Sequence, residues 1–143
     1  MTMPTAIVDR LKECAKDACR RAYAPYSRFP VGAAVLANDG VIYAGANVEN
    51  ASYGLAICAE RAAIFQAIAG GARQIQAVVV YTPTPIPSAP CGACRQVINE
   101  FGCDALIVCC TDDPQVERHY RLCELLPDAF GPGNLDGNRG PPK

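Results

Sequence analysis

The sequence lacks an excess of charge of either sign, with 13 Lys and Arg against 14 Asp and Glu and a formal net charge of −1 at pH 7. It therefore offers no basic patch for a nucleic-acid polymer and no polybasic segment for a membrane surface. A long uncharged run, residues 74–93, is interrupted by prolines, which excludes a membrane span. The N-terminus lacks the basic and then apolar pattern of a signal peptide, so we expect a cytoplasmic protein.

Histidine is nearly absent, whereas cysteine is abundant. The single histidine, His119, lies in a charged segment and is not expected to bind a metal. Nine cysteines could form a disulfide framework, but their odd number, the missing signal peptide and a C-x-x-C spacing indicate reduced thiols. Free cysteine is among the residues most often buried. We therefore expect six of them to be core residues: Cys14, Cys19, Cys103, Cys109, Cys110 and Cys123.

The length of 143 residues and an apolar fraction of one half predict one domain, which we assign to residues 1–135. We expect loop after residue 126 and a flexible tail at 136–143. Periodicity and turn residues predict helices over about 7–22, 58–69 and 91–101, and strands over about 31–37, 41–49, 77–81, 105–110 and 116–122. The link 111–115 is too short for a parallel crossover, so the last two strands should be antiparallel. The prediction is a three-layer α/β/α fold with a mixed five-stranded sheet.

Three of the cysteines form a candidate zinc site. Cys91 and Cys94 are spaced C-x-x-C, Cys58 supplies a third thiolate, and soft sulfur ligands suit Zn²⁺. All three fall at the starts of predicted helices, where the helix dipole favours thiolates. Catalytic zinc sites leave one position open to water, and Glu60 stands two residues after Cys58, where it can handle protons. Three sulfurs, a non-ligand Glu and P-C-x-x-C are typical of zinc-dependent deaminases.

Arg61, the residue after Glu60, is a charged residue among apolar neighbours. It falls on one helical stripe with Ile57, Ile64, Phe65 and Ile68, where a cation needs a partner. We expect Arg61 to donate hydrogen bonds to the thiolates and to offset their charge. The alternative is an ion pair with some other carboxylate.

Spacing alone favours structural roles for three further residues. From spacing alone, we expect Phe29 to be a core residue. Asn47 and Glu49 lie on one face of the second strand, and we expect them to form its solvated end. Glu60 by itself could simply compensate the dipole of the second helix.

The chain resembles the small homotetrameric cytidine deaminases over residues 11–135. The resemblance is carried by NVENASYGL at 47–55, CAER at 58–61 and PCGACRQV at 90–97, with support from YSRFPVGAA at 26–34 and LLPDAFG at 125–131. It implies a cytidine deaminase-like fold and a homotetramer with active sites shared between subunits. The loop 82–90 looks longer and richer in proline than is usual in the family, and residues beyond 135 have no counterpart there.

The same resemblance implies roles for individual residues. Cys58, Cys91 and Cys94 would bind one Zn²⁺ per subunit, and Glu60 would shuttle protons. Residues implied to bind substrate are Phe29 on the pyrimidine, Asn47 and Glu49 on the ribose hydroxyls, Ala59, and Tyr53 and Phe130 reaching a neighbouring subunit's site. The implied reaction is hydrolytic deamination of cytidine and 2′-deoxycytidine to uridine and 2′-deoxyuridine, with release of ammonia, in pyrimidine salvage.

Three rival functions stay open. A blasticidin-type or modified-cytosine nucleoside deaminase would share the metal site, although NVENASY favours the nucleoside enzyme. A structural zinc module or thiol-rich binding domain would hold zinc without turnover. Editing of a polynucleotide is disfavoured, because no basic channel for a phosphate backbone is present.

Overall fold

One mixed sheet runs through the part of the chain that the structure describes, residues 3–135 of a computed structural model. The order across the sheet is β2-β1-β3-β4-β5. The strands are β1 (Gly32–Ala37), β2 (Ile42–Ala46), β3 (Ile75–Tyr81), β4 (Leu106–Cys110) and β5 (Arg118–Arg121). β1 is antiparallel to β2 and β3, β3 is parallel to β4, and β4 is antiparallel to β5. The predicted mixed sheet and its antiparallel last pair are confirmed, while the predicted tail at 136–143 lies outside the described residues.

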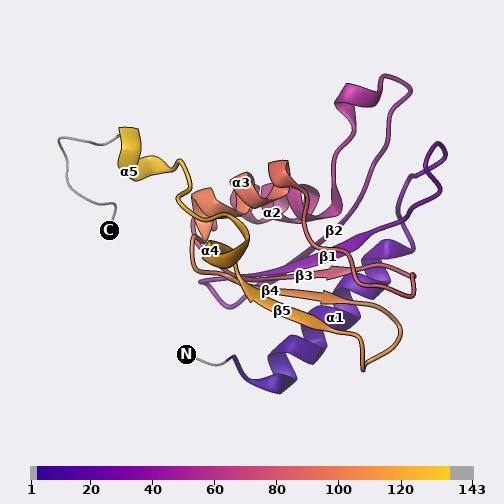
Figure 1. Cartoon of the computed structure of the whole chain (residues 1–143), viewed down its shortest axis with the longest axis horizontal. Coiled ribbons are helices and arrows are strands. Elements are labelled where there is room, and N and C mark those ends of the chain that lie inside the picture. Colours follow the sequence, from indigo (N-terminus) through magenta and orange to yellow (C-terminus); the bar gives the residue numbers. More distant parts are fainter. Residues whose placement is uncertain (1–2, 136–143) are drawn as a thin grey trace.

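Helices cover both faces of the sheet (Figure 1). α1 (Thr5–Cys19) packs on one face, and α2 (Ala59–Ala69) and α3 (Gly92–Phe101) pack on the other. Side chains alternate along β1, so Ala33 and Val35 join the core under α2 and α3 while Ala34 joins the core under α1. A strand buried on both faces needs a continuous apolar run, which β1 supplies. The three-layer prediction is confirmed.

Gly45 allows β2 and α2 to approach closely. A Cβ atom at this position would lie 2.6 Å from the backbone nitrogen of Ala63, closer than side chains tolerate. Only glycine therefore fits where the edge strand passes under the helix. Cys58 and Glu60 lie at the start of α2. The close contact between Gly45 and α2 therefore sets the distance between these two residues and the sheet.

Several element boundaries differ from those predicted. β2 ends at Ala46 instead of residue 49, because β1 begins at Gly32, which pairs with Ala46, and no partner strand continues beyond that pair. Val48 instead forms isolated bridges to Tyr23 and Ile57. α1 ends at Cys19, three residues before the predicted end at 22. Three short helices were not predicted: the 3-10 helix η1 (Tyr53–Leu55), α4 (Leu122–Leu125) and α5 (Pro132–Leu135).

The predicted burial of the six remaining cysteines is only partly correct. Cys19, Cys109 and Cys110 are buried and Cys14 is half-buried, but Cys103 and Cys123 are exposed. Cys103 lies in the turn after α3, and Cys123 lies on α4, a four-residue helix that buries only Leu122. All nine cysteines are free. Among the described residues, none of the helices is both long and apolar enough to cross a membrane.

Candidate active site

The three predicted zinc ligands converge. Cys58 is the N-cap of α2, Cys91 is the N-cap of α3, and Cys94 lies in the first turn of α3. Their Sγ atoms all lie within 4.8 Å of one another, and those of Cys58 and Cys91 are 3.8 Å apart. Within residues 3–135 this is the one cluster of three or more Cys, His, Asp or Glu ligand atoms. Three convergent thiols are a ligand set for Zn²⁺ with a fourth position free, so the residues present fit the metal.

The protein around the thiols already favours a thiolate at Cys58. A hydrogen bond with Cys94, and further ones with Arg61 and Cys91, outweigh burial and lower the pKa of Cys58 to about 5. The pKa of Cys94 is raised, because this thiol is hydrogen-bonded to Cys58 and is buried beside the Glu60 carboxylate. As the pH rises, Cys58 at the start of α2 therefore ionises before Cys94.

Arg61 takes the position that its helical stripe predicts. Its Nη2 donates to the Sγ of Cys58 over 3.3 Å, and this hydrogen bond raises the pKa of the guanidinium. Arg61 makes no ion pair with a carboxylate among the described residues, so the geometry favours the thiolate over the alternative. Its Nε is buried without a hydrogen-bond partner.

Glu60 is a buried carboxylate, only 4% exposed, in the first turn of α2. Burial raises its pKa, and the negative charge on Cys58 adds to the effect. A residue that only compensates the helix dipole gains its small stabilisation at the surface and has no reason to be buried. Burial beside the thiols fits a carboxyl group that exchanges protons.

Asn47 and Glu49 both hold the segment at residues 26–31. Asn47 Oδ1 accepts from the backbone nitrogen of Val31 (2.8 Å), and its Nδ2 donates to the carbonyl of Phe29 (2.9 Å). Glu49 Oε1 accepts from the backbone nitrogens of Tyr26 (2.9 Å) and Ser27 (3.2 Å). Hydrogen bonds led by that from the Ser27 side chain lower the pKa of Glu49. Both side chains are half-exposed, but they have fixed backbone partners, which the interpretation as a solvated strand end did not include.

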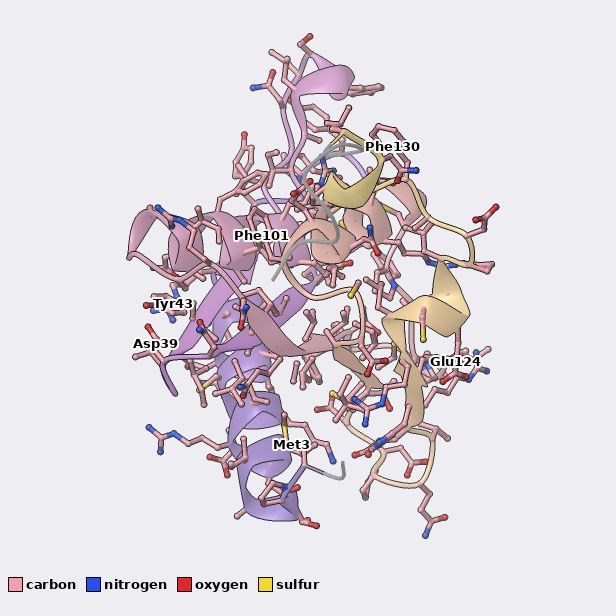
Figure 2. All side chains as sticks on the ribbon, turned by 90° about the vertical axis from the view of Figure 1, so that its left-hand side faces the viewer. Met3, Asp39, Tyr43, Phe101, Glu124 and Phe130 are labelled. Atoms are coloured by element: carbon pink, nitrogen blue, oxygen red, sulfur yellow. The ribbon has the colours of Figure 1, made fainter. Side chains whose placement is uncertain are left out.

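The aromatic residues of the expected site face outward. Phe29 is 41% exposed, so its interpretation as a core residue is wrong. Tyr53 is 75% and Phe130 is 59% exposed, and Figure 2 shows Phe130 at the surface beside α5. The ring centroids of Tyr53 and Tyr26 are 5.7 Å apart. These two tyrosines line a pocket of about 310 Å³ with Ser27, Glu49, Asn50 and Ala56. Ala59, next to Cys58, is fully buried.

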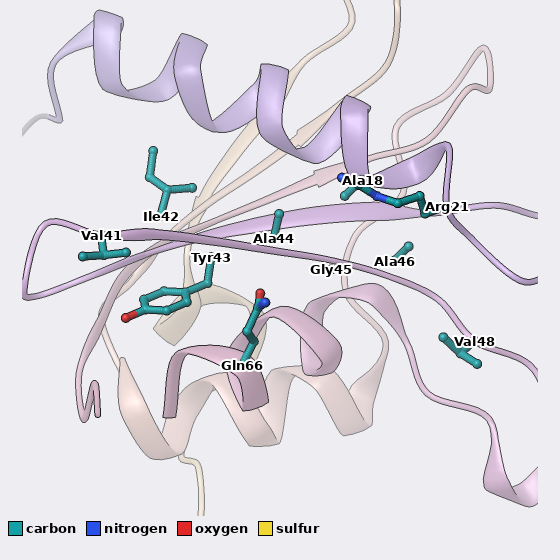
Figure 3. Close-up of a pocket in the computed structure, with 10 residues that line it drawn as sticks. All are labelled: Ala18, Arg21, Val41, Ile42, Tyr43, Ala44, Gly45, Ala46, Val48 and Gln66. Carbon is teal, nitrogen blue, oxygen red and sulfur yellow. The ribbon is translucent and has the colours of Figure 1, made fainter. Parts of the chain in front are cut away.

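A second hollow lies apart from these residues. It has a volume of about 610 Å³ and follows β2, between Ala18 and Arg21 on one side and Gln66 on the other (Figure 3). None of the predicted site residues lines it.

Three residues of α3 with contacts near the site were not predicted. Arg95 Nε donates to the carbonyl of Pro90, the residue before Cys91, over 2.8 Å. Gln96 and Asn99 both donate to the carbonyl of Phe130. The only sequence signal was their place directly after C-x-x-C, which does not identify distant backbone partners.

Comparisons with known proteins agree with this geometry. Residues 6–110 match the family model described as "Cytidine and deoxycytidylate deaminase zinc-binding region". A cytidine deaminase of Sporosarcina psychrophila is 45% identical over 128 residues, which is 90% of this chain and 94% of that protein. One of Mycobacterium tuberculosis is 42% identical over 137 residues, or 96% and 99%. The crystal structure of cytidine deaminase from Burkholderia pseudomallei has a TM-score of 0.82 and 48% identity, covering 90% of this chain and all of that one.

Proposed function

This chain belongs to the zinc-binding cytidine deaminase family, and from that membership we propose that it deaminates cytidine and 2′-deoxycytidine by hydrolysis. The products are uridine or 2′-deoxyuridine and ammonia, as in pyrimidine salvage. One observation carries the proposal: three thiols converge at two helix starts, with a buried carboxylate two residues from one of them. A structural zinc site has no need of that carboxylate.

Cys58, Cys91 and Cys94 would hold one Zn²⁺ per subunit. When bound, zinc supplies Lewis acidity, which allows water to act as a nucleophile near neutral pH. Arg61 offsets part of the charge of three thiolates through its bond to Cys58 Sγ.

Glu60 moves the protons of the reaction. Its carboxylate takes a proton from the attacking water and delivers it to N3 of the pyrimidine, which makes C4 electrophilic. The water oxygen bonds to C4 as a hydroxyl, Glu60 takes the remaining proton from that hydroxyl and passes it to the exocyclic nitrogen, and the C4–N bond breaks to release ammonia. The water oxygen remains as the carbonyl oxygen of uridine. Burial of Glu60 keeps bulk water away from these transfers.

The segment at 26–31 and its two supporting side chains bind the nucleoside. Phe29 packs on the pyrimidine, and Asn47 and Glu49 bind ribose hydroxyls. A carboxylate offers about four lone pairs, and the backbone nitrogens of Tyr26 and Ser27 together with the Ser27 side chain use three of those on Glu49. One lone pair therefore remains for a hydroxyl, so the same side chain can support the segment and bind the sugar.

The assembly is a homotetramer in which Tyr53 and Phe130 complete the site of a neighbouring subunit. Both aromatic rings are more than half exposed, and exposed aromatics of this size are common at subunit interfaces. Neither ring has a core role in its own chain.

A substrate panel tests the proposed activity. Ultraviolet absorbance and ammonia release are followed with cytidine, 2′-deoxycytidine, free cytosine and blasticidin S. We expect turnover of both nucleosides and little with cytosine. Preference for blasticidin S would favour the antibiotic deaminase, and a zinc-loaded protein without ammonia release would indicate a structural zinc module.

Mixing two inactive variants tests the shared sites. Glu60→Gln lacks the proton shuttle and Phe130→Ala lacks the covering ring. If sites are shared, co-expressed chains form some sites with Glu60 from one chain and Phe130 from another, so activity returns. Failure to recover activity, or a fully active monomer in sedimentation, would contradict the shared site.

A further inference from the structure

α3 does more than present Cys91 and Cys94, because its next polar side chains all bind the C-terminal segment. Gln96 Nε2 donates to the carbonyl of Phe130 over 2.9 Å, and Asn99 Nδ2 donates to the same carbonyl over 3.3 Å. Gln96 and Asn99 are three residues apart and so lie on one face of the helix. A carbonyl oxygen has two lone pairs, so one acceptor satisfies both amides.

Arg95 adds a third contact and joins the segment to the metal loop. Its Nη1 donates to the carbonyl of Leu125 over 2.9 Å, while its Nε donates to the carbonyl of Pro90. The planar guanidinium has several donors in fixed directions, so it can hold two carbonyls at once. Residues 125–130 are thereby attached to the helix that carries two of the three thiols.

Apolar packing does little to hold the far end of this segment. Phe130 is 59% and Leu135 is 78% exposed, and α5 buries none of its residues. The backbone at Gly131 instead runs close to Asn99, since a Cβ there would lie 3.2 Å from Asn99 Nδ2. The amide hydrogen bonds are therefore what fixes the backbone at Phe130 while its ring faces outward.

We propose that Arg95, Gln96 and Asn99 are positioning residues that fasten the segment to α3 and so set where Phe130 enters the neighbouring site. The inference rests on the proposed function, in which Phe130 covers the substrate of another subunit. From Cys94 to Asn99 the helix rises only about 7 Å. In each subunit, α3 thus connects the metal centre to Phe130, the ring that covers the site of the neighbouring subunit.

The chain contains no tryptophan, so Phe130→Trp gives a single fluorescent reporter of the ring position. The test variant adds Gln96→Met and Asn99→Leu, which keep the side-chain shape and remove both donors. Glu100→Met, an exposed position on the same helix, is the matched control. We expect the anisotropy of the tryptophan emission to fall in the test variant and to stay unchanged in the control.

Kinetics of the same substitutions without the reporter separate positioning from general damage. Loss of two net hydrogen bonds predicts about a 30-fold lower kcat/KM for cytidine, mainly through KM, with one zinc per chain retained. Each single substitution keeps one donor, so its effect should be intermediate. Unchanged anisotropy and unchanged kcat/KM in the double variant would overturn the inference, as would loss of zinc with unchanged KM.

Failure of the proposed function has a different signature. A wild-type protein without cytidine turnover would overturn the deaminase proposal and any role of these residues toward substrate. The anisotropy comparison needs no activity, so it still decides whether the amides hold the segment.

Discussion

Replacing Arg61 with Met should weaken zinc binding and should change the stability of the metal-free protein much less. The substitution removes the donor that lies 3.3 Å from Cys58 Sγ and keeps a similar apolar stem. A hydrogen bond to a charged group is worth roughly 1.5–3 kcal/mol. The dissociation constant for zinc should therefore rise about 10- to 150-fold.

Stability of the metal-free form should change little, because two effects oppose each other. The hydrogen bond from Arg61 to Cys58 is lost in that form too. Arg61 Nε, however, is buried without a partner, and an unsatisfied buried donor costs on the order of 1–3 kcal/mol, a cost that Met removes. The free energy of zinc binding should therefore change more than the free energy of unfolding of the metal-free protein.

Zinc affinity is measured by competition with a chelating indicator, and stability by denaturant unfolding in the presence of a strong chelator. Arg73→Met is the matched control, because Arg73 lies beyond the other end of α2 and donates only to the carbonyls of Ile68 and Ala72. If Arg61→Met binds zinc as tightly as the wild type, the guanidinium does not support the ligands.

Three further variants test separate parts of the account. Cys91→Ala removes a ligand, so the stabilisation by excess zinc, about 4 kcal/mol at 1,000 times the dissociation constant, should vanish from its melting curve; a variant that still loads one zinc per chain would disprove the assignment. Glu49→Ala should lower kcat/KM about 10- to 100-fold for cytidine and barely for cytosine, whereas equal losses would mean that Glu49 acts only through residues 26–27. Burial alone would raise the pKa of Glu117, but His119 and Lys12 outweigh it and lower that pKa. Its contribution is therefore present above the unfolded pKa of about 4.3 and is lost as the pH falls through the folded value. Glu117→Gln should cost up to about 1 kcal/mol of unfolding free energy at pH 7 and nothing near pH 3; a difference that is constant with pH would contradict this.

The metal cluster was predictable because local rules placed it. C-x-x-C at a helix start brings two thiols within one turn, and Gly70 with Gly71 marks the end of the helix that begins after Cys58. Arg61 was predictable for a similar reason, since a cation on an apolar stripe needs an anionic partner and the nearest was a thiolate.

Two of the wrong predictions depended on partners that are distant in the sequence. β2 ends where β1 stops offering a pairing partner, which periodicity in β2 cannot reveal. Spacing put Asn47 and Glu49 at a solvated end, because their acceptors and donors in residues 26–31 are about 20 positions away along the chain. Cys103 and Cys123 are exposed because average burial preference says nothing about a particular turn or a four-residue helix.

Turnover of cytidine by the wild type and by Glu60→Gln, with zinc measured on the same samples, tests the central claim most directly. The account predicts that the wild type releases one ammonia for each uridine formed. Glu60→Gln should stay folded with one zinc per chain and lose activity by about 10²–10⁴-fold, because the ligands remain and the proton shuttle is gone. Wild-type rates in Glu60→Gln, or a zinc-loaded wild type that releases no ammonia, would contradict it.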